Sequence, residues 1–185
     1  MKKATVKLKS VSPYSQSKHY DVDKLEKESH VDYEKRTWKN RCHVDKDGIV
    51  FIPPMAFKNC LAEAAKYLSI QIPGKGKATY TKHFEAGVLV TEPLSLGVHI
   101  DDVNGEALFV PADGKRGGSR RVTKYFPYIT EWEGKVDFMI LDETITKNVF
   151  ADVIEQAGKF IGIGRFRPRN NGYYGRFAIE SVKWE

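Results

Sequence analysis

The stretch VFIPPMAFKNCLAEAA, residues 50–65, joins a short apolar run to a helical pattern through two prolines. Residues 48–52 have the composition of a short strand. Pro53 and Pro54 favour a first helical turn, because the missing N–H of proline would be unpaired there anyway. Apolar residues then recur at helical spacing: Phe57, Leu61, Ala64, Ala65 and Leu68. We therefore predict a strand followed directly by a helix that ends before Pro73.

The flanking segments extend this alternation of strands and helices. Residues 2–11 place Ala4, Val6 and Leu8 on one face and basic or polar residues on the other, which predicts a half-buried strand with a basic outer face. Residues 121–133 and 135–141 flank Gly134 and predict a β-hairpin.

A second helix and a last strand follow. Thr144 or Thr146 would cap the helix, and Gly162 and Gly164 would stop it. Its apolar face comprises Val149, Phe150, Val153, Ile154, Ala157 and Phe160. Residues 177–184 then predict the final strand.

Two stretches interrupt this order. Residues 12–47 are polar and too long for an ordinary connection, so they form a long loop or a functional insertion. Residues 75–120 mix short strand-like pieces (79–84, 87–90, 94–100 and 107–110) with Gly and Pro, and predict a second insertion. Without the insertions the order is β-α-β-β-α-β. The sequence therefore predicts one α+β domain over residues 1–185, of the ferredoxin-like pattern shared with RNA-recognition domains.

The net charge and the cysteine content of the sequence indicate the kind of partner and the cellular environment to expect. The formal net charge of +6 favours a polyanionic partner. Cys42 and Cys60 form no CxxC pair or disulfide framework, which indicates reduced thiols. No apolar stretch has the length of a signal peptide or membrane span, so we expect a cytoplasmic protein that contacts no membrane.

The strongest functional signal is GIGRFRPRNNGYYGRF, residues 162–177. Glycines permit positive φ and close backbone approach, guanidinium groups pair with phosphates, and aromatic rings stack on bases. The residues that we expect to bind nucleic acid here are Arg165, Arg167, Arg169, Tyr173, Tyr174 and Arg176. The alternative is a flexible surface loop with solvated charges.

Two further basic segments invite the same interpretation, with solvated surface residues as the alternative. Residues 114–124 carry Lys115, Arg116, Arg120 and Arg121 without an intervening acid, as a finger against a phosphate backbone would. In the early loop, Arg36, Lys39 and Arg41 surround Trp38.

Catalytic signals are weak. The early loop contains Asp21, Asp23 and Asp32 with His19, His30 and His43, but their spacing fits no zinc pattern. Neither a P-loop nor a common hydrolase motif is present. We expect no metal or cofactor and a protein that is not an enzyme.

Three segments together resemble the RAMP superfamily, the ferredoxin-like RNA-binding proteins of CRISPR effector complexes, and especially their repeated backbone subunit. Residues 50–65 are similar to the family's "IPGSSLKGALR" stretch, with Ile52, Pro53, Phe57 and Lys58 in place. Pro54 replaces the usual glycine, and Met55 and Ala56 replace serines. SPYSQSK after the first strand and GYYGRF near the end resemble the family's entry to a long loop and its "GFGR" ending.

The resemblance implies RNA held along a palm by Lys58 and the glycine-rich loop, a thumb-like insertion at about residues 75–120, and self-association or assembly with other RAMP-type subunits. It also implies Asp32 as the nearest match to an aspartate that cleaves RNA in some members. The first hypothesis is a non-catalytic protein that binds single-stranded RNA, or DNA. The alternatives are an endoribonuclease using Asp32 and a phage-encoded mimic that engages a host CRISPR complex.

Overall fold

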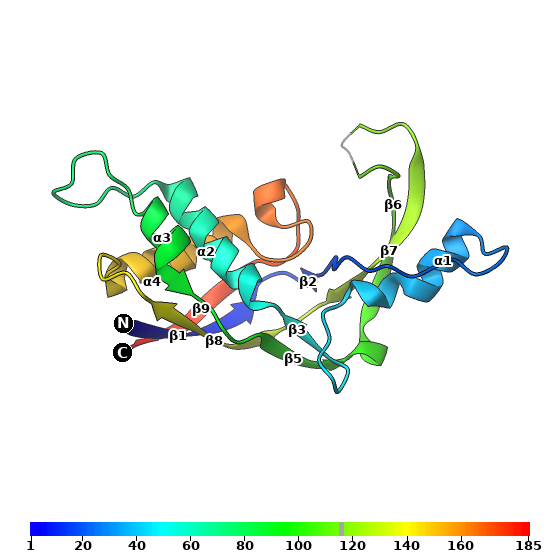
Figure 1. The fold of residues 1–185 in the computed structure, drawn as a ribbon, viewed down its shortest axis with the longest axis horizontal. Helices are drawn as coiled ribbons and strands as arrows, with labels where there is room; N and C mark the ends of the chain where they lie inside the picture. The colour runs from blue at the N-terminus through cyan, green and yellow to red at the C-terminus, as the bar shows by residue number, and fades with distance from the viewer. Residues whose placement is uncertain (115–116) are drawn as a thin grey trace.

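In the computed structural model, which describes residues 1–114 and 117–185, strand β1 (Lys2–Ser10) lies inside a four-stranded antiparallel sheet (Figure 1). It pairs with β8 (Glu133–Ile140) on one side and β9 (Phe177–Trp184) on the other. The two-residue strand β4 (Val88–Leu89) completes the order β4-β8-β1-β9. Ala4, Val6 and Leu8 are fully buried, as the alternation predicted.

Two helices cover one face of this sheet (Figure 1). Helix α2 (Pro54–Leu68) begins at the predicted prolines, and α4 (Lys147–Gln156) is capped by the hydroxyl of Thr146. A π-helical turn, η3 (Ala157–Ile161), continues α4 to Gly162. The wider turn changes the helical phase, which explains why Phe160, predicted on the apolar face, is 48% exposed and lies against Tyr67.

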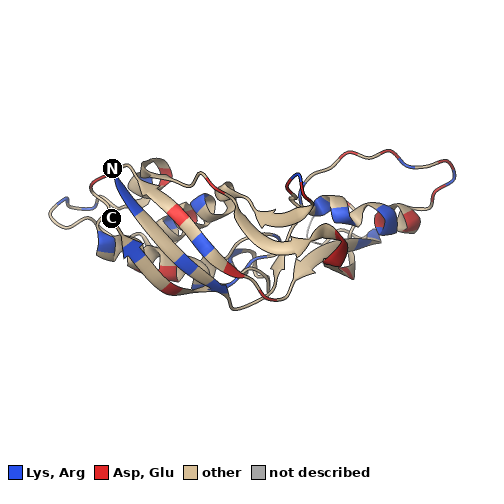
Figure 2. Cartoon of the chain, turned by 90° about the horizontal axis from the view of Figure 1, so that it is seen from below, with Lys and Arg blue, Asp and Glu red and all other residues tan. Residues whose placement is uncertain are grey.

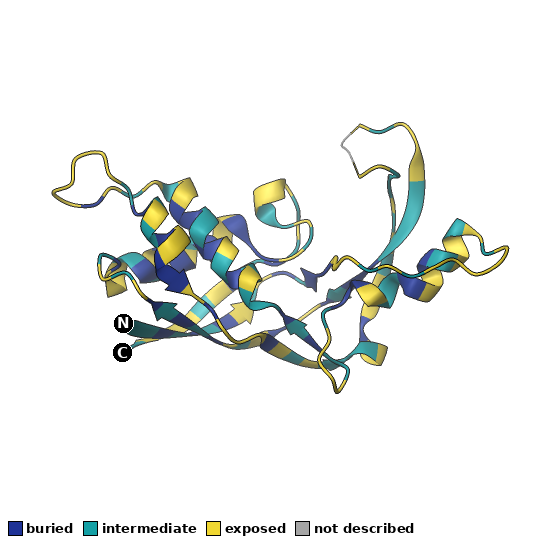
Figure 3. Ribbon diagram, in the orientation of Figure 1, coloured by how far each residue is buried: buried dark blue, intermediate teal, exposed yellow. Residues whose placement is uncertain are grey.

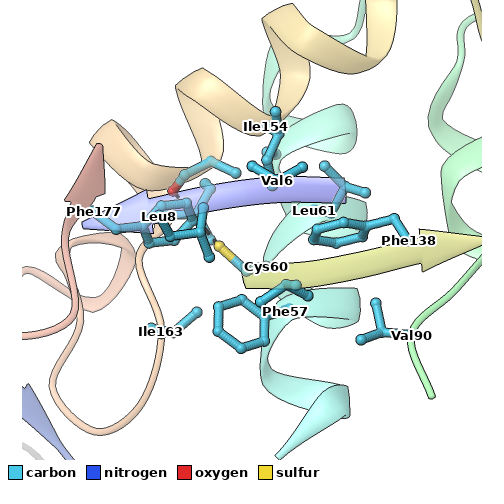
Figure 4. Packing of buried hydrophobic residues seen from close by; sticks show 14 of the residues in the cluster. Val6, Leu8, Phe57, Cys60, Leu61, Val90, Phe138, Ile154, Ile163 and Phe177 are labelled. Carbon is cyan, nitrogen blue, oxygen red and sulfur yellow. Dashed lines mark hydrogen bonds between the residues drawn. The ribbon is translucent and has the colours of Figure 1, made fainter. Parts of the chain in front are cut away.

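The hydrophobic core lies between these helices and the sheet (Figure 4). Phe57, Leu61 and Phe138 lie at its centre. Ile163 and Phe177, at the two ends of the glycine-rich loop, are buried at its edge. Both cysteines are buried and free, and burial raises the pKa of the Cys42 thiol to about 11. The prediction of unpaired cysteines is confirmed.

A second set of elements extends away from the termini (Figure 1). Strands β2 (Tyr14–Ser15), β7 (Arg121–Ile129) and β6 (Asn104–Pro111) form a sheet in the order β2-β7-β6. Strands β3 (Ile49–Ile52) and β5 (Leu94–His99) form another. Three 3₁₀ turns complete the chain: η1 (Trp38–Arg41), η2 (Ile100–Asp102) and η4 (Pro168–Asn170). This region is more exposed than the core (Figure 3).

Three predicted elements need correction. The long early loop contains helix α1 (His30–Thr37), which packs on β7. Residues 81–87 form helix α3 (Thr81–Gly87) instead of a strand, because Tyr80, Phe84 and Gly87 bury one face beside α2. The predicted thumb-like insertion at 75–120 is divided, since β4 joins the main sheet and the projecting hairpin is β6–β7.

The predicted hairpin around Gly134 is wrong. Strands β7 and β8 belong to different sheets, and Gly134 lies within β8 opposite Leu8. A Cβ on Gly134 would lie 2.4 Å from Leu94 Cδ1. Gly134 therefore leaves room for the Leu94 side chain within a strand and does not form a turn.

The face of the sheet opposite the helices carries alternating charges (Figure 2). Lys3 pairs with Asp137 at 2.8 Å, and Lys7 pairs with Glu180 at 2.7 Å. Thr5 also donates a hydrogen bond to Asp137. Lys3 and Lys7 are therefore partly neutralised.

Asp137→Asn is expected to reduce stability at neutral pH by less than about 1 kcal/mol, because the pair is solvent-exposed. Hydrogen bonds from Lys3 and Thr5 hold the pKa of Asp137 below its ordinary value. The stabilisation is thus present above the ordinary pKa and disappears as the pH falls through the lowered one. Urea unfolding of both proteins at pH 7 and below pH 3 measures this. An unchanged difference at low pH would contradict the assignment.

No helix in the described part of the chain is long and apolar enough to cross a membrane.

Candidate nucleic-acid interface

The glycine-rich loop is held in a fixed path by its backbone. Arg165 N donates to Ser15 O and Gly175 N donates to Pro13 O, both at 2.8 Å. Gly164 and Gly175 have φ of +79° and +77°, and a Cβ on Gly175 would lie 1.8 Å from Ile163 O. The loop therefore needs glycine where two backbone segments touch, and the predicted alternative of a flexible loop does not describe it.

Arg165 is mostly buried, and its guanidinium is engaged by other residues of the protein. Its side chain is 14% exposed, and Nη2 contacts Glu106 Oε1 at 3.1 Å. Nε donates to Ser15 Oγ, and the guanidinium stacks over the Phe126 ring at 3.9 Å. Burial lowers the pKa of this guanidinium, an effect that Glu106 opposes. We assign Arg165 to joining the loop to the β6–β7 hairpin.

Arg167 and Arg169 share one carboxylate on α2. Glu63 accepts from Arg167 at 2.7 Å and from Arg169 at 3.2 Å. The side chain of Arg169 is 48% exposed and that of Arg167 is 23% exposed. Glu63 therefore partly neutralises both arginines, and a phosphate would have to compete with Glu63 for them.

The aromatic residues of the loop divide into one anchored ring and two free ones. Tyr174 donates its hydroxyl to Glu106, and burial followed by that hydrogen bond raises its pKa to about 12. Tyr173 is 60% exposed and lies edge-on to Tyr174. Phe166 is 51% exposed. Tyr173 and Phe166 are therefore the rings that could stack on bases.

The early basic cluster is largely engaged within the protein. Arg36 pairs with Glu28 through Nε at 2.7 Å and Nη2 at 2.9 Å. Lys39 Nζ donates to the carbonyl of Asp101 and lies over the Trp38 ring. Arg41 is buried and paired with Glu34. The structure therefore revises Arg41 from a ligand contact to a core residue.

Asp32 has a structural role. Its carboxylate accepts from Ser29 Oγ at 2.6 Å, and its N–H donates to the same hydroxyl, which caps α1. Among the described residues, no three His, Cys, Asp or Glu side chains are placed to hold a metal ion.

The basic finger projects on the β6–β7 hairpin. Arg121 Nη1 donates to Phe109 O, and Arg120 lies in the loop just before β7. Lys115 and Arg116 lie outside the described residues. Phe109 is 65% exposed on this hairpin.

A depression of about 320 Å³ forms where the early segment, the start of α2 and the glycine-rich loop meet. Its lining comprises Tyr14, Gln16, Ser17, Lys18, His43, Pro53, Met55, Ala56, Asn59, Gly164 and Arg165. Of these described lining residues, none is acidic. Lys18 is exposed at the rim, and burial followed by the Lys18 charge lowers the pKa of His43.

The depression also receives the start of α2. Pro53 supplies no side-chain cap, Pro54 has no N–H, and the N–H of Ala56 donates to Pro53 O, so the first helical turn leaves few backbone N–H groups free. The partial positive charge of such a terminus favours an anion. Together with Lys18 it makes this the described surface best suited to a phosphate.

Sequence reasoning indicated all three segments, the one ending at Lys18 through the resemblance alone, but it singled out neither Lys18 nor Asn59. Lys18 stands alone in the sequence, and Asn59 follows Lys58. Lys58 itself is half-buried and does not line the depression. No sequence pattern marks Lys18. The structure holds the neighbouring Gln16 in place, since Gln16 donates to Phe51 O and accepts from the N–H of His43.

Comparisons with known proteins add a structural likeness. No family model matches the chain, and no curated protein matches it. A crystal structure of Cmr6 from Pyrococcus furiosus is similar, with 12% identity and a TM-score of 0.48, over 95% of this chain and 97% of that one.

Proposed function

We propose that this chain binds single-stranded nucleic acid, RNA in preference to DNA, as a RAMP-type protein with a ferredoxin-like palm. The observation that carries the proposal is the depression that has a free lysine, an uncapped helix start and no acidic residue. The preference for RNA rests on the sequence resemblance alone.

The strand order supports the palm. Helix α2 follows β1, helix α4 lies between β8 and β9, and the sheet order is β4-β8-β1-β9. That is the order of a β-α-β-β-α-β unit in which the first and third strands are central. β4, with only two residues, is the shortest of the four.

The exposed side chains around the depression suggest a path for a bound nucleic-acid strand. A phosphate at Lys18 and the start of α2 would bring the neighbouring bases toward the glycine-rich loop. Exposed Tyr173 and Phe166 give stacking faces that accept any base. Arg120 in the β6–β7 hairpin supplies a further cation, and Arg169 would do so in competition with Glu63. Assembly of several copies along one strand belongs to this proposal.

A direct test is a polarisation titration of fluorescein-labelled single-stranded RNA at several salt concentrations. Affinity should fall steeply with salt, because each phosphate contact releases counterions. Lys18→Ala should weaken binding several-fold and reduce the salt slope by about one.

Lys77→Ala is the matched control, since Lys77 is an exposed lysine in the loop between α2 and α3. It should leave affinity unchanged. Equal effects of the two variants, or equal affinity for duplex and single strands, would overturn the proposal.

A further inference from the structure

Strand β9 is an edge of the main sheet. It pairs with β1 on one side only, and among the described residues no strand pairs with its other side. The backbone N–H and C=O groups along that edge can accept another strand.

An apolar groove of about 650 Å³ runs beside this edge. One wall is α4 and its π turn, where Ala151, Glu155 and Gly158 recur at helical spacing. The other wall is β9, with Ile179 and Val182 half-buried against the core. A strand added to β9 would point every second side chain into this groove.

The groove is open because its walls use small residues. A Cβ on Gly158 would lie 2.1 Å from Phe177 O, so the π turn touches β9 directly at this point. Ala151 and Ala178 leave space above the contact. π turns of this kind occur often at functional sites.

The charged residues that line the groove are Glu155, Lys159 and Arg176. Lys159 is paired with Glu155 at 2.5 Å. Arg176 lines the groove, and no carboxylate of the described residues lies within ion-pair distance of it. Its Nε donates only to the carbonyl of Lys159. Arg176 therefore offers an unpaired guanidinium to an acidic group in the groove.

We propose that the β9 edge and this groove bind an extended peptide of a partner protein, with apolar residues at alternate positions and an acidic residue facing Arg176. The peptide would add a fifth strand, a mode in which the backbone gives affinity and the pockets give specificity. A second copy of this chain is disfavoured, because each copy carries a net charge of +6. The site is separate from the depression proposed for nucleic acid.

The test uses the full chain, labelled with ¹⁵N, and a synthetic eight-residue peptide in which alternate positions carry three valines and one glutamate, with serine between them. The control peptide has the same composition in an order without alternation. The alternating peptide should shift the amide signals of residues 151–158 and 176–184, and the control peptide should not.

Two variants locate the site. Ala151→Glu should weaken peptide binding at least tenfold by filling the groove with a negative charge, and Arg176→Glu should do the same. Asp152→Ala, on the exposed side of α4, should leave it unchanged. Ala151→Glu should retain its affinity for single-stranded RNA, which separates this proposal from the one above.

Peptide shifts outside these residues, or an Ala151→Glu variant that binds the alternating peptide normally, would overturn the proposal. So would concentration-dependent dimerisation of the wild type that Ala151→Glu abolishes, since this outcome assigns the groove to a second copy.

Discussion

Glu34→Ala is expected to lower the free energy of unfolding by about 3–5 kcal/mol, the usual result of removing one partner from a buried ion pair. Glu34 and Arg41 have side chains only 4% and 9% exposed. The carboxylate accepts from Arg41 Nη2 at 3.1 Å and from the N–H of Tyr125 in β7 at 3.3 Å. Without it, the guanidinium would remain buried between the Tyr20 and Phe126 rings with its charge unbalanced.

This pair joins α1 and η1 to the strand that carries the β6–β7 hairpin. Its loss should therefore also increase hydrogen exchange of the β7 amides before those of β1. Guanidinium unfolding and exchange mass spectrometry measure the two effects.

Glu155→Ala is the matched control, because Glu155 pairs with Lys159 on the surface of α4, where both side chains are about half exposed. That change should cost less than about 1 kcal/mol. Similar losses in the two variants would show that Arg41 and Glu34 are not held as the structure describes.

Gly175→Ala should lower the free energy of unfolding by about 3 kcal/mol or more, because two unfavourable effects combine. A left-handed φ costs an L-residue roughly 1–2 kcal/mol. The new Cβ would also lie 1.8 Å from Ile163 O, a backbone atom that cannot move without displacing the loop. The hydrogen bond from Gly175 N to Pro13 O would then lengthen.

Gly74→Ala isolates the first penalty. Gly74 has a φ of +75° and nothing within 4 Å of a built Cβ. The free energy of unfolding of Gly74→Ala should fall only by the cost of the left-handed backbone conformation, about 1–2 kcal/mol. Thermal unfolding of both variants measures the difference, and equal losses would contradict the close approach of the glycine-rich loop to its neighbours.

The regular elements with strong local patterns could be predicted from the sequence. The alternation of β1, the prolines at the start of α2 and Thr146 before α4 each act within a few residues. Helix α1 was missed because its exposed face is polar and its buried residues, Glu34 and Thr37, are polar too. No apolar periodicity marks such a helix.

Strand pairing was the second failure. Gly134 between two strand-like segments favoured a hairpin, but β7 and β8 find partners far away in the sequence. Gly134 lies against the Leu94 side chain, a contact that no local pattern reveals.

The site was located approximately and its residues less well. A run of arginines indicates free charge only if no acid folds against it, and Glu63 and Glu106 lie about 60 to 100 residues away from the loop they neutralise. Lys18, conversely, is a single cation whose importance depends on the helix start folded beside it.

Crosslinking tests most directly the proposal that RNA binds at the glycine-rich loop and the depression beside it. Single-stranded RNA containing 4-thiouridine, irradiated with the full protein and digested, should yield crosslinked peptides from residues 14–18 and 162–176. Crosslinks confined to the outer sheet face around Lys3 and Lys7, or to the loop that contains Lys77, would contradict it.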